Sequence, residues 1–438
     1  MPVSDGESAP RGPLSISQAF GVRLFFEPRG RRRLIVGAAA LAAIGFAVQA
    51  VFQLATLGSA SLQYDYLPYA NAASALNHGG DPYSAFLNAC GSEWCNVGYI
   101  YPPLLAEAFR PLALLPPHTG AFIWLLLCYG MFAGAILVAD RVTAGWLSTT
   151  ARAGLLLLAL AFVPLYSSLH FFQVGPLMLL LMGLAAWAFT RRRDAVAGAV
   201  LGVSAVLRVT PIIQAPMLIR SRRDLLRPTG AAAMVVSAVA VVAFLALLTT
   251  TTFEYIDTVL PRLGVSTAVL DNQSLPGFVL RLQLLTGMPS AAAIHIGTLA
   301  LQALILGATL WYSLNLEGGR QRAAVFAAFL AVTPIVSSIT WGHHLVTELL
   351  VLVLIAPSLR TGSRAWWLAA ASYPLLWASR DATDPLVAAL GLAFPTGYRV
   401  LPFLALTSVN LIGMIVLWLA CLEVLGSYRL ATTPAETR

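Results

Sequence analysis

Lysine is absent from this sequence of 438 residues, and charged residues make up only 11% of it. A soluble domain carries roughly 25% charged residues, so the composition argues against a soluble protein. The chain also has no Walker loop, no GxGxxG followed by an acidic residue, and no GxSxG. Chemistry driven by ATP or nicotinamide therefore has no support. What the sequence has in quantity is hydrophobic residues, at 58%.

Apolar runs long enough to cross a bilayer recur from one end of the chain to the other. A chain in lipid must satisfy its backbone hydrogen bonds internally, so such runs are helices. We therefore predict an all-α polytopic membrane protein. No cleavable signal is expected, because the first run is too long and lacks a small-residue cleavage site. About ten full spans are predicted, near 34–56, 119–139, 153–168, 175–190, 229–250, 291–313, 323–336, 345–357, 365–379 and 400–425.

All 27 basic residues are arginines, and they gather in short connections between the apolar runs. This is the positive-inside bias, so the net charge of +8 indicates topology and not nucleic-acid binding. The segments 1–33 and 426–438 are both predicted to be cytoplasmic, on either side of a single transmembrane domain at 34–425. Two large outer loops then fall at 57–101 and 251–290. The lysine-free, Ala- and Arg-rich composition suggests a bacterial plasma membrane.

Two apolar segments are too short to cross the bilayer. The proline-bounded stretch "YPPLLAEAFRPLALLPP", residues 101–117, is predicted to be a re-entrant or interfacial helix at the outer surface. Residues 195–219 lie between two cytoplasmic arginine clusters and are predicted to form a half-depth helical hairpin. Its tip, "LRVTP", places Arg208 within the membrane. An arginine there is costly unless it meets an anion or a cavity, so a functional role is expected.

The chain has four cysteines, of which Cys90 and Cys95 lie in the first outer loop. An outer loop faces an oxidising compartment, so a structural disulfide between them, closing "CGSEWC", is predicted. Two free loop thiols are the alternative.

The predicted topology brings the unusual polar residues to the outer face. They come from four segments far apart in the chain: the passage that begins at Asp65, "SLHFFQVGP" with His170 and Gln173, "VLDNQSLPG", and "SSITWGHHL". We therefore expect one outer-facing site. Its candidate residues are Asp65, Tyr69, Asn71, Tyr101, Arg208, Asn272, Gln273, Trp341, His343 and His344.

Several of these residues also have a plainer interpretation. Asp65 is alternatively a hydrated loop acid or a helix N-cap, and the two histidines beside Trp341 alternatively belong to an interfacial aromatic belt. The "NQS" segment matches an N-glycosylation acceptor, which has no use in a bacterial chain. His343 and His344 are adjacent and point in different directions on a helix, so metal ligation has little support. No cofactor is predicted, and the metal requirement is left open.

The segments "DYLPYANAASALNHGGDPY" with "YIYPPLLAEAFRPLALLP", "FFQVGPLMLL" to "LRVTP", "NQSLPGFVLRL" and "SSITWGHHLV" follow in order from about residue 60 to 357. Together they resemble the bacterial polyprenyl-phosphate-mannose-dependent mannosyltransferases, which are integral-membrane glycosyltransferases of the GT-C fold class. In that family the acid of the first outer loop is catalytic, and it matches Asp65. The family's tryptophan–histidine segment lines the same cavity. The family usually has a lysine where this chain has Arg208.

The resemblance implies sugar transfer from a polyprenyl-phosphate carrier to a glycolipid or glycan acceptor, because no nucleotide sugar is available outside the membrane. Asp65 would be the general base of an inverting single displacement. A phosphate leaving group needs charge stabilisation, which His343, His344 or Arg208 would supply, and no general acid. The remaining candidates would contact sugars: Tyr69, Asn71, Tyr101, Asn272, Gln273 and Trp341.

Three other functions compete with this hypothesis. A relative that transfers arabinofuranose from its prenyl-phosphate carrier would use the same chemistry. A transporter also has broken hairpins with intramembrane charges, but transporters tend to place polar residues near the midplane and to show internal repeats. No convincing repeat is found here. A non-catalytic membrane scaffold is disfavoured, because the polar residues are concentrated at one face.

Overall fold

The computed structural model describes residues 28–57, 65–90, 98–219, 229–248, 251–288, 292–378, 380–392 and 397–432. Within these ranges all regular structure is helical, which confirms the predicted all-α class. The predicted cytoplasmic segment 1–33 lies mostly outside the described residues. Cys95 also lies outside them, so the Cys90–Cys95 disulfide stays a prediction.

The bounds of the α-helices, in chain order, are as follows: α3 (Pro28–Thr56), α4 (Tyr66–Asn77), α5 (Ser84–Cys90), α6 (Pro103–Ala113), α7 (Pro117–Thr143), α8 (Thr149–Leu160), α9 (Val163–His170), α10 (Gly175–Thr190), α11 (Asp194–Leu207), α13 (Thr229–Leu248), α14 (Thr251–Glu254), α15 (Leu260–Gly264), α16 (Leu275–Thr286), α17 (Ala292–Ser313), α18 (Gly319–Val336), α19 (Glu348–Ile355), α20 (Arg364–Trp377), α21 (Arg380–Ala389), α22 (Val400–Thr407) and α23 (Val409–Thr432). Short 3-10 or π segments complete the set: η2 (Thr210–Leu218), η3 (Tyr255–Val259), η4 (Gly342–Thr347), η5 (Ala356–Ser358) and η6 (Gly397–Arg399).

Five of the described helices, namely α3, α7, α13, α17 and α23, are long and apolar enough to cross a bilayer. A sixth crossing is obtained if α8 and α9, which meet at a bend of 46°, count as one span. Helices such as α10 and α20 are shorter than a bilayer-spanning helix of about 20 residues. The chain is therefore a multi-pass membrane protein, and the number of ten spans stays a prediction.

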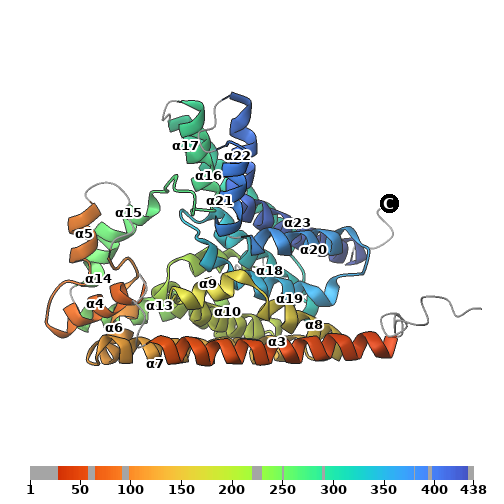
Figure 1. Cartoon of the computed structure of the whole chain (residues 1–438), viewed down its shortest axis with the longest axis horizontal. Helices are drawn as coiled ribbons and strands as arrows, with labels where there is room; N and C mark the ends of the chain where they lie inside the picture. Colours follow the sequence, from red (N-terminus) through yellow and green to blue (C-terminus); the bar gives the residue numbers. More distant parts are fainter. Residues whose placement is uncertain are drawn as a thin grey trace, which may run out of the picture.

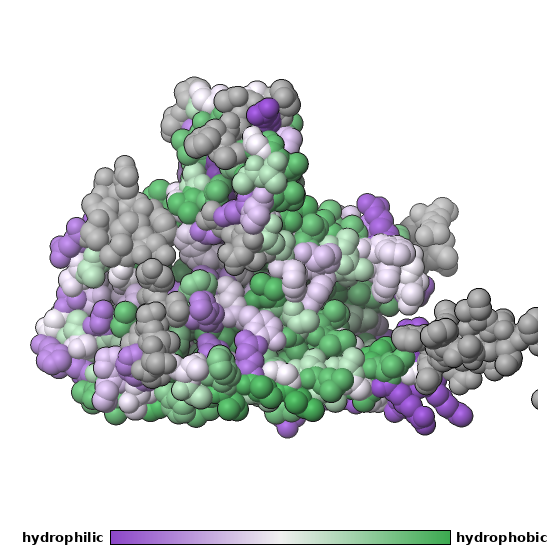
Figure 2. Space-filling view, viewed as in Figure 1, coloured by the Kyte–Doolittle hydropathy of each residue, from purple (hydrophilic) through white to green (hydrophobic). Residues whose placement is uncertain are grey.

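The lipid-facing surface is clearest on α3, which runs along one edge of the molecule (Figure 1). Leu41, Val48 and Phe52 on this helix are all more than 60% exposed. Figure 2 shows hydrophobic residues along this edge and hydrophilic ones at the N-terminal end of α3, where Arg31 and Arg32 are exposed. Apolar exposure on this scale is stable only against lipid or another protein.

The centre of the fold is α18, on which every residue from Arg322 to Val336 is buried. It packs against α10, α19, α23 and η2 (Figure 1). The guanidinium of Arg322 forms ion pairs with Asp194 at the start of α11 and with Glu317, and it lies over the ring of Phe189. This buried arginine is therefore neutralised where three helices meet.

The predicted hairpin at 195–219 is broken at its expected tip. Helix α11 ends at Leu207, Arg208 is extended, and the 3-10 segment η2 begins at Thr210. Along α11, Gly198 and Gly202 meet the backbone of α13 so closely that a Cβ at either position would collide with a carbonyl oxygen. The glycines thus let two helix backbones approach, as in small-xxx-small packing, and fix α11 beneath the site.

The prediction of one continuous span at 400–425 is wrong in detail. The segment is two helices, α22 and α23, separated at Ser408. The hydroxyl of Ser408 accepts a hydrogen bond from the buried Arg281 (3.1 Å), and Asn410 Nδ2 donates to three carbonyls at the end of α20. Polar contacts with neighbouring segments therefore fix the break, and α23 continues to Thr432.

Candidate functional site

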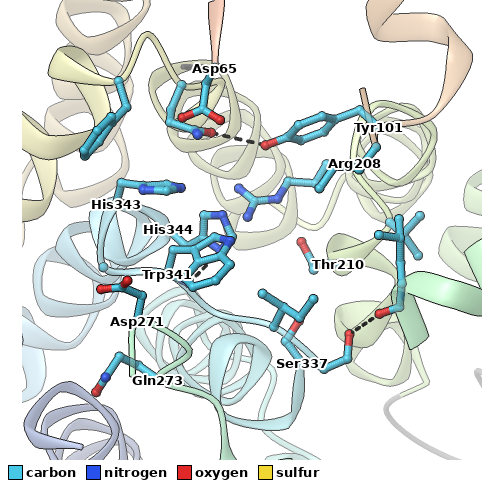
Figure 3. Close-up of a pocket in the computed structure, with 18 of the residues that line it drawn as sticks. Asp65, Tyr101, Arg208, Thr210, Asp271, Gln273, Ser337, Trp341, His343 and His344 are labelled. Atoms are coloured by element: carbon cyan, nitrogen blue, oxygen red, sulfur yellow. Dashed lines mark hydrogen bonds between the residues drawn. The ribbon is translucent and has the colours of Figure 1, made fainter. Parts of the chain in front are cut away.

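A cavity of about 1100 Å³ opens among α4, α9, the segment 98–102, η2 and the segments 264–273 and 336–344. It brings together eight of the ten predicted site residues from distant parts of the chain (Figure 3). These are Asp65, Tyr69, Tyr101, Arg208, Gln273, Trp341, His343 and His344. The predicted convergence of outer-loop segments on one site therefore agrees with where the structure places these residues.

Asp65 occupies the N-cap position of α4, but its side chain makes no capping hydrogen bond. The carboxyl points into the cavity instead (Figure 3). Burial raises its pKa from 3.8 to about 6, and a hydrogen bond from Gln173 opposes the rise. A carboxyl with a pKa near neutrality both holds and releases a proton at physiological pH, which suits a general base.

Tyr69 and Tyr101 surround this carboxyl and share one partner. Their hydroxyls donate to Oε1 of Gln173 at 3.3 Å and 3.2 Å, and their rings meet edge to face with centroids 5.4 Å apart. Burial raises the pKa of both phenols, so both remain neutral donors. The segment that contains Gln173 is one of the four predicted to reach the site, but the sequence predicts no role for this residue. The sequence feature that could have indicated a role for Gln173 is an amide side chain in an otherwise apolar turn.

Arg208 reaches the cavity from the junction of α11 and η2, and its guanidinium lies between Tyr101 and the two histidines (Figure 3). Burial, together with the positive charge of Arg208, lowers the pKa of His343, which precedes the predicted span at 345–357, to about 3. His343 is therefore neutral, and its Nε2 is enclosed without a hydrogen-bond partner among the described residues. A buried, unpartnered nitrogen beside a cation is suited to a ligand's hydrogen-bonding group.

His344 is oriented by a bond to the backbone. Its Nδ1 accepts a hydrogen bond from the backbone N–H of Trp341 at 3.2 Å, so in the neutral ring the proton is on Nε2. The His343 and His344 rings meet edge to face at 4.6 Å. Arg208 and the two imidazoles thus form one cluster of nitrogen-bearing side chains in the cavity.

The amides of the predicted second outer loop make most of their hydrogen bonds within the protein. Asn272 is fully buried, and its Nδ2 donates to Ser266 Oγ (3.1 Å) and to two backbone carbonyls, while its Oδ1 accepts from the N–H groups of Ser274 and Thr340. It does not line the cavity. Gln273 does line it, but its Nε2 donates to Leu270 O (2.7 Å) and Thr407 O (2.9 Å). Sugar contacts by these amides stay predictions, and the geometry shows them fixing the loop.

Two further placements differ from expectation. Asn71 is exposed on α4 and does not line the cavity, so a contact with a ligand there stays a prediction. Asp271, which the sequence analysis did not single out, does line the cavity and lies near Trp341 (Figure 3). Its neighbour Asn272 does not line the cavity, because its amide is held by the hydrogen bonds with Ser266, Ser274 and Thr340 described above.

Among the described residues, no group of three histidine, cysteine, aspartate or glutamate side chains is placed to hold a metal ion. The polar groups of the cavity are instead one carboxyl with a raised pKa, a cluster of donors, and aromatic rings. This set suits proton abstraction from a hydroxyl next to a bound anion.

Comparison with known families gives a match to glycosyltransferase family 87 over residues 99–340, more than half of the chain. The matched range includes Tyr101, Gln173, Arg208 and the segment 251–290 predicted as the second outer loop, and it ends one residue before Trp341.

A curated relative is the polyprenol-phosphate-mannose-dependent alpha-(1-2)-phosphatidylinositol pentamannoside mannosyltransferase of Mycobacterium tuberculosis (strain CDC 1551 / Oshkosh), which is 31% identical over 157 residues. The alignment covers 35% of this chain and 36% of the relative, so the chain matches about a third of that protein's length.

Proposed function

The chain belongs to glycosyltransferase family 87, and from that premise we propose that it transfers a mannosyl residue from polyprenyl-phosphate-mannose to a glycolipid or glycan acceptor. The observation that carries the proposal is the position of Asp65, a carboxyl with a pKa of about 6, in the same cavity as Arg208 and two histidines. The name of the curated relative supports the choice of donor.

The reaction we propose is a single displacement with inversion at the anomeric carbon. The Asp65 carboxylate takes the proton of an acceptor hydroxyl as its oxygen attacks the anomeric carbon. The bond from that carbon to the phosphate oxygen breaks, and its electron pair leaves with the prenyl phosphate. The carboxylate regenerates by losing its proton to solvent. Since the phosphate is a good leaving group, no second carboxyl is needed as a general acid.

Arg208 and the two histidines would stabilise the charge on the departing phosphate. The guanidinium lines the cavity as a cation, and His343 has an enclosed nitrogen without a partner among the described residues. A phosphate between them satisfies both groups at once. Because the imidazoles are neutral, the binding of a phosphate at this position would depend mainly on the charge of Arg208.

The membrane setting fits a lipid-linked donor. The cavity has apolar lining from Ile212 and Ile213 on one side and from Val163, Leu376 and Trp377 on the other. Ile212 and Trp377 keep 53% and 45% of their surface exposed, which leaves apolar area free for a prenyl chain. A GT-C fold with both termini in the cytoplasm and the cavity at the outer face of a bacterial plasma membrane completes the proposal. The family match argues against the transporter alternative.

The test is sugar transfer by the purified protein in nanodiscs. Radiolabelled polyprenyl-phosphate-mannose and a lipid extract are supplied, with the arabinofuranose carrier in a parallel arm. We expect label from the mannose donor in a new product with the wild type, and a loss of about 10²- to 10⁴-fold with Asp65→Asn.

Asp257→Asn is the matched control, because Asp257 is an exposed carboxylate of the second outer loop that does not line the cavity. It should transfer like the wild type. Transfer from the arabinofuranose carrier alone would replace the donor in this proposal. A folded Asp65→Asn protein that transfers at the wild-type rate would refute the mechanism.

A further inference from the structure

The Gln173 side chain contacts three polar side chains that line the cavity. It is 3% exposed, lies in the turn between α9 and α10, and hydrogen-bonds with Asp65, Tyr69 and Tyr101. Since its oxygen accepts from the two phenol hydroxyls, its NH₂ group must face the carboxyl, because a carboxylate only accepts. The orientation of this amide is therefore set by its partners.

The turn that carries Gln173 is held from several sides. Its backbone N–H donates to Ser168 O (2.9 Å), and Trp124 Nε1 donates to Phe172 O (2.8 Å). The thiol of Cys128 also faces the backbone carbonyl of Gln173, with Sγ 3.8 Å from that oxygen. Phe172 has φ +56°, a left-handed conformation that is unfavourable for a bulky side chain. A strained residue persists where its surroundings over-determine it, and such residues cluster at functional sites.

We propose that Gln173 is a positioning residue, which directs the Asp65 carboxylate at the acceptor hydroxyl and stabilises its ionised form. This inference rests on the function proposed above. Tyr69 and Tyr101 act in it through Gln173: by donating to the amide oxygen they polarise the amide and strengthen the donation of its NH₂ group to Asp65. Their hydroxyls are therefore used in orienting the base and not in holding a sugar.

Other charged and titratable groups also line the cavity with Asp65, namely Arg208, Tyr255, Asp271, His343 and His344. The hydrogen bond from Gln173 lowers the pKa of Asp65, in opposition to burial. Its loss should therefore move the acidic limb of the pH–rate profile upward while leaving these other groups in place.

The decisive variant is Gln173→Glu, which keeps the length of the side chain but replaces the NH₂ donor by a carboxyl. We expect transfer at about pH 7 to fall by about 10²-fold and the acidic limb to rise by at least about one pH unit. Activity should recover as the pH is raised further, and KM for the donor should stay within about twofold, because Gln173 acts through Asp65. A merely structural defect would not be recovered by pH.

Gln53→Glu is the matched control. Gln53 on α3 also accepts a hydrogen bond from a tyrosine, Tyr129 (2.7 Å), but it does not line the cavity. Gln53→Glu should leave the acidic limb of the pH–rate profile at the same pH as in the wild type. Gln173→Met, which removes the donor without adding a charge, should move the limb in the same direction as Gln173→Glu and carries the test if the glutamate variant does not fold.

A second readout is independent of turnover. Dicyclohexylcarbodiimide modifies protonated carboxyls in apolar surroundings, so the pH at which labelling of Asp65 is half complete can be read by peptide mass spectrometry. We expect this midpoint to rise in both Gln173 variants. An unmoved midpoint, or a raised KM with an unmoved limb, would overturn the positioning role. A wild type that transfers from no donor would refute the proposed function, whereas the labelling result would still decide the role of Gln173.

Discussion

On one side of the cavity Tyr69 and Tyr101 donate hydrogen bonds to the oxygen of Gln173, and the Gln173 side chain hydrogen-bonds in turn with the carboxyl of Asp65. We call this the Asp65 wall. On the other side, the segments 266–274 and 337–340 direct theirs toward each other, and we call this the Asn272 wall. Ser266 Oγ and Ser274 Oγ both donate to Ser338 O, at 2.7 Å and 3.1 Å, and Gln273 N donates to Thr340 O at 2.7 Å.

The difference shows that polar residues close to a cavity do not all serve a ligand. The Asn272 wall uses its amides to hold two connections in a fixed relation, and it is secured further by the buried Arg281, which donates to Val269 O and Asn272 O. The Asp65 wall keeps a carboxyl partly desolvated. Removing a polar group from the Asn272 wall should therefore cost stability, and removing one from the Asp65 wall should cost activity.

Arg208 lies between the two walls, and among the exchanges compared below its removal should have the largest effect. Arg208→Met should lower transfer by about 10²- to 10³-fold, because the phosphate loses its permanent cation. Arg208→Lys should retain part of the activity, since it keeps the charge but not the planar fork. Initial rates at saturating donor measure both. Equal losses in the two variants would show that geometry, and not charge, is what Arg208 provides.

An amide-to-carboxyl exchange on the Asn272 wall should come next. Asn272→Asp replaces an NH₂ group within hydrogen-bond distance of three acceptors by a carboxylate that faces the carbonyls of Thr267 and Ser338. We expect the free energy of unfolding to fall by about 3 kcal/mol, measured by thermal melting in detergent. A variant as stable as the wild type would show that this wall does not depend on the Asn272 bonds.

The reverse exchange on the Asp65 wall, from carboxyl to amide, should raise the free energy of unfolding instead of lowering it. The pKa of Asp65 is raised from 3.8 to about 6 by burial, so the folded state binds its proton more tightly than the unfolded chain does. Stability is therefore greatest below the ordinary pKa of 3.8 and falls as the pH rises through about 6. Asp65→Asn should raise the free energy of unfolding by about 1–2 kcal/mol at about pH 7.5, and by nothing near pH 3.5. Melting curves at both values test this, and destabilisation at the higher pH would contradict it.

The smallest effect is expected at Asn71, which has the same chemistry as Asn272 but is exposed and belongs to neither wall. Asn71→Ala should change the free energy of unfolding by less than about 0.5 kcal/mol and transfer by less than about twofold. Both assays named above apply. A large loss of transfer with unchanged melting would show that a substrate extends beyond the cavity to α4.

The sequence predicted the parts of the site that topology determines. The positive-inside distribution of arginine and the order of the apolar runs were enough to bring Asp65, Trp341, His343 and His344 to one face. The amides were harder to interpret. The letters "NQS" show that polar groups are present, but not whether they face a cavity or the protein, because in an irregular loop no periodicity fixes the direction of a side chain.

Other features depend on tertiary contacts that a single sequence does not display. The role of Gln173 follows from tyrosines that are 104 and 72 residues away. The break at Ser408 follows from Arg281, which is 127 residues away. Fewer described helices than the predicted ten are long enough to span a bilayer for a related reason: helices such as α10 are short, and their neighbours cover them.

The burial of α18 has a consequence for how the chain is inserted during synthesis. A segment without a lipid-facing side, with Arg322 near its start, gains little free energy by moving from the translocon into the lipid before its partner helices are present. Its partners α10 and α11, with the acidic Asp194, are synthesised before it, whereas α23 follows. We expect α18 to stay beside the translocon until the earlier helices have assembled. Biogenesis of this protein would then couple insertion to folding, and a truncated chain that ends after α18 would be a substrate for membrane proteases.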